Sequence, residues 1–250
     1  MKKASIFVKG IITLSMVLSL AIGAKAQGDS IKVTADIVSS YIWRGTVGNA
    51  YKGNMFSPNF QPTIAYVKGP LEIGAWGSTD FAGTYKESDL YLTLTFGNLA
   101  ITATDYFFPD VSGTTTAVPR YFTYDNKLTA HIIEASASYK ISDKVPFSIL
   151  VATMVYGADK SATDATKQNY STYIELGYAF KRFSAFAGLT PSNGYYGAGY
   201  GKVDGFNAVN LGIKATRNLK ISDKFDLPLT GTLGINPQSE MLYMVFGITL

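Results

Sequence analysis

The sequence predicts an all-β fold, a transmembrane antiparallel up-and-down β-barrel of about 12 strands that covers residues 27–250. Charged residues make up 16% of the chain, aromatic residues make up 14%, and there are 24 glycines, a balance that suits strands whose outer face meets lipid. The last ten residues alternate strictly, as in an extended strand with one apolar face. This face carries Leu242, Met244, Phe246, Ile248 and Leu250. Such a closing strand is typical of an outer-membrane barrel.

Residues 1–26 are expected to be a cleaved secretory signal peptide. A basic start precedes an apolar run over 11–22, and Ala24, Lys25 and Ala26 form an A-x-A cleavage motif. The chain has no cysteine, so a lipid-modified cysteine and a disulfide framework are both excluded. We therefore expect export to the outer membrane of a diderm bacterium.

The basic isoelectric point, about 9.0, comes from the leader. Four of the 22 basic residues lie in the predicted signal peptide, which has no acidic residue, so 18 basic residues remain against 18 acidic ones. A neutral mature chain gives no electrostatic support for a nucleic-acid partner. No later stretch has the roughly 18 apolar residues of a membrane-spanning helix.

The first half of the mature chain is expected to form five strands, because apolar side chains recur there at every second position. The strands cover 31–43, 60–67, 71–78, 89–96 and a run that begins at 99. The apolar faces carry Ile31, Val33, Ala35, Ile37, Tyr41 and Trp43 in the first strand, Phe60, Ile64 and Tyr66 in the second, Leu71, Ile73 and Ala75 in the third, and Leu90, Leu92, Leu94 and Phe96 in the fourth.

The second half is expected to form seven more strands, at 130–141, 147–156, 172–180, 183–190, 207–216, 227–235 and 241–250. Pro62 and Pro228 are expected near strand ends, because proline cannot donate a hydrogen bond within a ladder. The connections alternate in length, which is typical of short periplasmic turns and longer outer loops. The short ones are 68–70, 97–98, 142–146 and 181–182, and the longer ones are 45–58, 79–88, 108–127, 157–169 and 191–205. The turn predicted at 217–226 is longer than this rule favours.

Aromatic residues on the apolar faces gather beside the short connections, where an interfacial girdle is expected. The periplasmic girdle would comprise Tyr66, Phe96, Tyr139, Phe147, Phe180 and Phe183. Tyr41 and Trp43, with Phe60, would contribute to the outer girdle.

Charged residues on the opposite faces are expected to point into the barrel, because Arg or Lys on the lipid face at mid-bilayer costs about 2–4 kcal/mol. The predicted lumen-lining residues are Lys32, Asp36, Arg44, Glu72, Glu134, Glu175 and Lys214. They either line a water-filled pore or pair across the lumen and plug it, since an unpaired buried charge is costly.

Catalysis has little support in the sequence. His131 is the single histidine, and Glu134 lies three residues on, which places it on the opposite face of a strand. The chain shows no phosphate-binding glycine loop, no EF-hand spacing and no His/Cys cluster for zinc. We expect no enzyme activity and no cofactor, although a lipid-modifying barrel enzyme would have to use His131.

The segment Ala35-Asp-Ile-Val-Ser-Ser-Tyr-Ile-Trp-Arg-Gly45 resembles the opening strand of the TorF-type porin family, whose pattern is roughly S-x-Y-x-x-R-G. The segments 60–66, 74–78 and 87–91 are similar to the next strands of that family, whereas Leu250 stands where the family ends in Phe. The resemblance implies an outer-membrane channel and no established catalytic residue.

These observations predict a porin-like channel for small polar solutes or ions. Its partners would be outer-membrane lipid and, through the last strand, the barrel-assembly machinery. Two alternatives stay open, a plugged barrel that serves structure or surface interactions and a soluble periplasmic barrel with its apolar face turned inward.

Overall fold

The computed structural model describes residues 29–47, 57–109, 120–125, 128–161, 164, 166–191, 194–196, 205–223 and 225–250. Across these ranges every regular element is a strand, and no helix there is long and apolar enough to cross a membrane. The predicted signal peptide lies outside the described residues.

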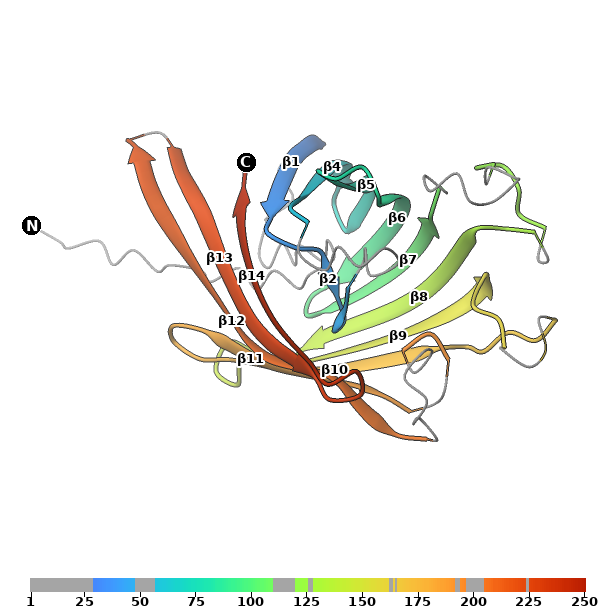
Figure 1. Cartoon of the computed structure of the whole chain (residues 1–250). Helices are drawn as coiled ribbons and strands as arrows, with labels where there is room; N and C mark the ends of the chain where they lie inside the picture. Colours follow the sequence, from blue (N-terminus) through green and yellow to red (C-terminus); the bar gives the residue numbers. More distant parts are fainter. Residues whose placement is uncertain are drawn as a thin grey trace, which may run out of the picture.

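Twelve antiparallel strands form one closed barrel, which confirms the predicted fold class and strand number (Figure 1). Each strand pairs with its neighbours in the chain, and the ring closes where the first strand meets the last. The barrel strands are β1 (Ser30–Val38), β4 (Asn59–Lys68), β5 (Leu71–Asp80), β6 (Lys86–Phe96), β7 (Leu99–Phe107), β8 (His131–Lys140), β9 (Phe147–Gly157), β10 (Thr172–Ala179), β11 (Ser184–Thr190), β12 (Asn207–Ser222), β13 (Phe225–Asn236) and β14 (Met241–Thr249). Two short strands, β2 (Ile42–Trp43) and β3 (Thr46–Val47), form a separate hairpin.

The closing seam pairs β1 with β14 in antiparallel register, with Ile37 opposite Ile248 and Asp36 opposite Thr249. The register keeps the apolar alternation of both strands in phase, so Ile37 and Ile248 share the outer face. Leu242 of β14 is 67% exposed, whereas its inward neighbour Tyr243 is 4% exposed. The barrel therefore turns its apolar side outward, which argues against the soluble barrel with an apolar core.

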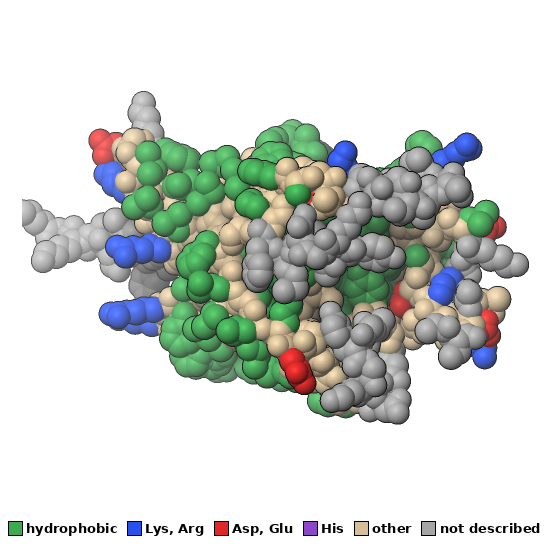
Figure 2. All heavy atoms as spheres, in the orientation of Figure 1, with side chains coloured by type: hydrophobic (Ala, Val, Ile, Leu, Met, Phe, Trp, Pro, Cys, Tyr) green, Lys and Arg blue, Asp and Glu red, His purple; other side chains and the backbone are tan. Residues whose placement is uncertain are grey.

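The outer surface carries a broad band of hydrophobic side chains over the left and central part of the visible face, and most of the Lys and Arg side chains lie toward its two ends (Figure 2). Because this band is formed by alternate residues of successive strands, a change of register by one residue would invert it.

The first strand is shorter than predicted. β1 ends at Val38, and Ser39 closes it through hydrogen bonds with Phe246, one from the Ser39 amide at 2.8 Å and one to the Ser39 hydroxyl at 3.0 Å. The chain then leaves the wall and runs into the barrel, so that β2 and β3 lie inside the ring of strands (Figure 1). The prediction that one strand continues to residue 43 was wrong. Tyr41 and Trp43 keep the period-two spacing of a wall strand, but they come after the chain has left the wall, and both are buried inside the barrel.

The β12–β13 hairpin is longer than predicted. β12 runs to Ser222 and β13 starts at Phe225, so most of the turn expected at 217–226 is strand. Beyond Lys214, β12 has no partner on β11 and pairs with β13 alone. This two-stranded ribbon projects beyond the rest of the barrel (Figure 1).

Candidate functional site

The interior hairpin turns at two residues with left-handed backbone conformation. Arg44 has φ 51° and Gly45 has φ 81°, and Ile42 pairs with Val47 across the turn. Two central residues with positive φ are typical of the tight turns that match the twist of antiparallel strands. The turn is thereby fixed, and the Arg44 side chain stands at its tip.

The hairpin tip is pressed against the barrel wall at β12 and β13. A Cβ atom on Gly45 would lie 2.1 Å from the carbonyl oxygen of Val209 on β12, so only glycine fits there. The Asn236 side chain of β13 donates to the carbonyl oxygen of Gly45 at 3.0 Å. The hairpin tip is therefore anchored to β12 and β13.

Arg44 forms a bidentate ion pair with Glu134 of β8. Nη1 donates to Oε2 at 2.6 Å and Nη2 donates to Oε1 at 2.8 Å, and the two side chains are 9% and 2% exposed. The Tyr106 hydroxyl of β7 donates to the same carboxylate at 3.1 Å. Charge-assisted bidentate bonds are among the strongest in proteins, so this pair ties the hairpin to the wall.

Three aromatic rings surround the Arg44 guanidinium. Its Cζ lies 4.6 Å from the ring centroid of Trp43, 4.9 Å from that of Tyr173 and 5.9 Å from that of Tyr196. Arg44 also donates to the Tyr196 hydroxyl. Burial raises the pKa of the Tyr196 phenol above its ordinary value, so the hydroxyl stays neutral beside the cation. The cation is held by one carboxylate and by aromatic faces.

A second group of contacts holds the base of the hairpin. The Tyr41 ring lies 5.6 Å from those of Trp76 and Tyr85, and the Tyr85 hydroxyl donates to Glu87 at 2.5 Å. One buried cluster contains Tyr41, Trp43 and Trp76 together with side chains from several strands. The hydrophobic packing of this region is thus centred on the hairpin.

The part of the lumen toward the short connections is polar. Lys32 and Glu72 lie 4.0 Å apart, and the Tyr91 hydroxyl donates to Glu72 at 2.7 Å. Hydroxyls of Thr93 and Thr102 are 2.8 Å apart. The barrel interior therefore has a polar half toward the short connections and an aromatic half in which buried charges such as Arg44 and Glu134 lie among aromatic rings.

The structure brings together some of the predicted lumen-lining residues and separates others. Arg44 meets Glu134 but not Glu72, which pairs instead with Lys32. Asp36 accepts from Thr249 at 2.5 Å, and Glu175 accepts from Tyr173 at 2.5 Å. Lys214 lies on β12 opposite Ser184 of β11.

The predicted girdle residues divide into two groups. Phe96, Tyr139, Phe180 and Phe183 are exposed at 56%, 45%, 49% and 41% beside short connections, and the last two rings stack with centroids 4.7 Å apart. Tyr66 and Phe147 are partly exposed on the same end of their strands. The prediction of an outer girdle at Tyr41 and Trp43 was wrong, because these residues are 5% and 7% exposed inside the barrel.

His131 belongs to a different cluster from Glu134. Its Nδ1 lies 2.7 Å from the Asp105 carboxylate, its Nε2 lies 2.5 Å from the carbonyl oxygen of Tyr121, and its ring stacks on Tyr124 at 4.2 Å. Both ring nitrogens are engaged by protein acceptors and the side chain is fully buried. This arrangement fastens residues 121–124 to the barrel wall and leaves neither nitrogen facing a substrate.

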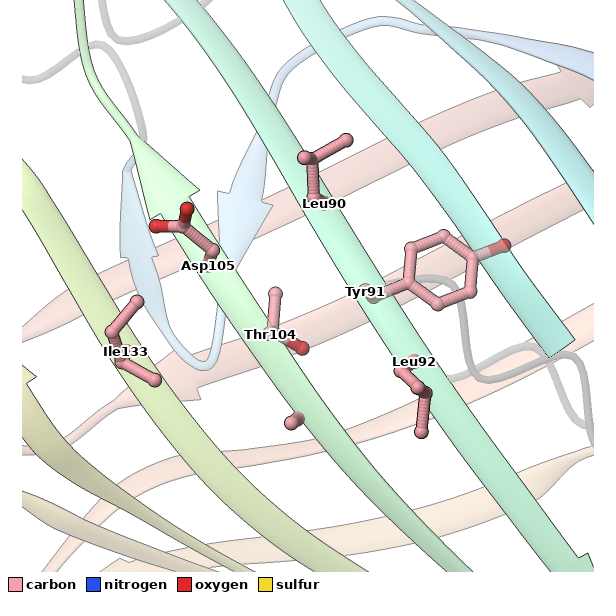
Figure 3. Close-up of a pocket in the computed structure, with 7 residues that line it drawn as sticks. Leu90, Tyr91, Leu92, Thr104, Asp105 and Ile133 are labelled. Carbon is pink, nitrogen blue, oxygen red and sulfur yellow. The ribbon is translucent and has the colours of Figure 1, made fainter. Parts of the chain in front are cut away.

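A shallow hollow lies beside Asp105 on the outside of the wall (Figure 3). It is lined by Leu90, Leu92, Ala103 and Ile133, and the polar group at its edge, Asp105, is already bonded to His131 and Tyr124. The hollow forms because the small Ala103 side chain lies among larger apolar neighbours. Its lining is apolar like the rest of the outer face.

Across the described part of the chain, no group of three or more His, Cys, Asp or Glu side chains could hold a metal ion. The sequence matches no protein-family model, and no curated protein is significantly similar to it.

Sequence reasoning missed the aromatic partners of Arg44. Tyr173 and Tyr196 come from β10 and from the connection after β11, and Tyr106, which donates to Glu134, comes from β7, so no local pattern links them. A partial signal existed, because Gly45 follows Arg44 between apolar residues and could have indicated a tight hairpin.

Proposed function

We propose that the mature chain is an outer-membrane barrel that acts as a channel for small polar solutes or ions. The observation that carries this proposal is a closed ring of twelve strands with an apolar exterior and charged and hydroxyl side chains inside. A closed barrel satisfies every backbone hydrogen bond in lipid, and an apolar exterior is what lipid requires. The resemblance of the first strands to TorF-type porins points the same way.

The interior hairpin would set the width of the passage. A barrel of this size falls between eight-stranded barrels, whose interior is filled by side chains, and sixteen-stranded porins, which hold an aqueous channel. Because Arg44 reaches Glu134 and Gly45 reaches β12, the hairpin narrows the aromatic half of the lumen. We propose a small conductance that rises when the hairpin is released.

A second candidate, a plugged barrel without transport, is favoured by the same hairpin. The bidentate ion pair of Arg44 and the burial of Trp43 would hold a permanent plug. Under this alternative the connections at the outer end would meet partners at the cell surface.

Single-channel recording from the purified mature chain in a planar bilayer distinguishes these candidates. The channel proposal expects discrete current steps in the wild type and larger steps in Arg44→Ala. A silent wild type together with a silent Arg44→Ala, both shown to be inserted, would support the plugged barrel.

A further inference from the structure

Most of the groups that hold Arg44 come from outside the hairpin. Glu134 lies on β8, Tyr106 on β7, Tyr173 on β10, and Tyr196 follows β11. Of the groups in contact with the guanidinium, Trp43 alone belongs to the hairpin. Glu134, Tyr106 and Tyr173 belong to barrel strands, and Tyr196 belongs to the connection after β11. The Tyr106 and Tyr196 rings also contact the Trp43 ring.

These wall groups are fixed by contacts of their own. Tyr106 donates to Glu134 at 3.1 Å. Asn210 donates to the Tyr173 hydroxyl at 3.0 Å, and the Tyr173 ring packs over Gly188, where an added Cβ would lie 2.2 Å from the phenol oxygen. The Tyr173 and Tyr196 rings contact one another at 5.4 Å between centroids. The site is therefore already shaped for a planar cation, which reduces the cost of binding one.

The chemistry of the site selects guanidinium among cations. A carboxylate that accepts two parallel N–H bonds matches the fork of guanidinium, and flat aromatic faces favour its planar, weakly hydrated surface. An alkylammonium ion supplies the positive charge that pairs with Glu134, but it cannot donate the two parallel N–H bonds. Urea has the planar shape of guanidinium but carries no charge.

We infer that the wall around Glu134 is a binding site for solutes that carry a guanidinium group, and that Arg44 occupies it as a tethered ligand. A soluble guanidinium compound that displaces Arg44 would release the hairpin tip. This inference rests on the proposed channel function, because it names guanidinium compounds as the class of solute that would enter the channel. Binding itself does not require a current.

Chemical rescue tests the site directly. Arg44→Ala removes all of the side chain beyond Cβ, which corresponds to ethylguanidinium, and leaves Glu134 buried without its cation. We expect ethylguanidinium, at concentrations far below those that denature proteins, to raise the temperature at which the folded band of Arg44→Ala is lost in a heat-modifiability gel. Ethylammonium and urea at equal concentration are the matched controls for charge and for shape.

The double variant Arg44→Ala/Glu134→Gln separates the site from general effects of the compound. We expect ethylguanidinium to bind Arg44→Ala at least about ten-fold more tightly than the double variant, since the charge-assisted pair is lost. Equal stabilisation of both variants, or equal rescue by urea, would overturn the inference. If Arg44→Ala refolds poorly, the refolding yield becomes the readout, and it must recover with ethylguanidinium but not with ethylammonium.

The two proposals can fail separately. Rescue in a barrel that carries no current would keep the guanidinium site and refute the channel. Current without any selective rescue would keep the channel and refute the site. In a conducting wild type, ethylguanidinium should alter single-channel current when added to the side of the outer loops, whereas sodium at the same ionic strength should not.

Discussion

Single side chains decide whether the hairpin stays in the barrel, and the strongest contribution comes from one buried ion pair. Arg44 and Glu134 are almost wholly removed from solvent and each satisfies the other's charge. Such a pair adds little net stability compared with an apolar substitute, but the loss of one partner leaves an uncompensated charge. The pair therefore fixes the hairpin's position more than it stabilises the barrel.

We expect Glu134→Gln to lower the free energy of unfolding by about 3–5 kcal/mol, because Arg44 would be left buried without its carboxylate. The measurement is urea-induced unfolding in lipid vesicles. Lys32→Ala is the matched control, since Lys32 is 30% exposed and its 4.0 Å pair with Glu72 should contribute less than about 1 kcal/mol. Similar losses in both variants would show that Arg44 and Glu134 are no more desolvated than Lys32 and Glu72.

Gly45→Ala tests the contact at the hairpin tip. Its Cβ would meet the Val209 carbonyl at 2.1 Å in a left-handed backbone conformation, so we expect the tip to move and stability to fall by about 1–3 kcal/mol. Gly69→Ala serves as the control, because Gly69 also has a positive φ but no neighbour within 4 Å of the added Cβ. If Gly45→Ala loses no more stability than Gly69→Ala, the tip is not pressed against β12.

At the scale of the strands, the period-two alternation of apolar side chains correctly predicted the outer and inner faces of the barrel wall. It did not predict the hairpin inside the barrel. Leu92 and Thr93, or Leu242 and Tyr243, divide outer from inner faces as the period-two pattern requires. Tyr41 and Trp43 follow the same pattern in the hairpin, but an element packed inside a barrel is buried on both sides, so its alternation carries no information about lipid. Leu219 and Ile221 continue the period-two pattern of β12 beyond the closed barrel, where β12 pairs with β13 and not with β11. Their alternation therefore marks a two-stranded ribbon and not the barrel wall.

Neighbouring residues of β6 test the two faces of the wall. Leu92→Arg places a charge on the exposed apolar face, where it should cost about 2–4 kcal/mol in a bilayer and impair assembly. Thr93→Arg points the same charge at the polar lumen beside Thr102 and should be tolerated far better. Assembly into liposomes, followed by heat-modifiability gels, gives the comparison. Equal assembly of the two variants would mean that the outward assignment is wrong.

At the scale of the whole molecule, the barrel depends on one seam between distant parts of the chain. β1 and β14 share three paired positions, and Leu250 adds two backbone hydrogen bonds with Ala35 at 2.8 and 3.2 Å. The sequence predicted this closure from the last ten residues. It could not predict the contents of the lumen, because Arg44, Tyr173 and Tyr196 meet through the fold and not through any local pattern.

Removal of residues 246–250 should prevent formation of the folded band, because β1 would lose every paired position on β14 and residues 229–231 of β13 would lose theirs, which leaves open edges in lipid. The control is a chain of full length in which Phe246 is replaced by Leu, which keeps an apolar side chain on the outer face. A truncated chain that still migrates as a compact, heat-modifiable species would show that the barrel closes without this part of β14.

The most direct test of the account is the single-channel conductance of two proteins in the same planar bilayer, the wild type and a variant in which residues 40–47 are replaced by a Gly/Ser segment of equal length. If the hairpin narrows a channel, the wild type gives small discrete steps. The variant, which is less heat-stable because Glu134 has lost its cation, still shows a folded band and gives steps several-fold larger. Identical conductance in the two proteins, or no current from either, would contradict the account.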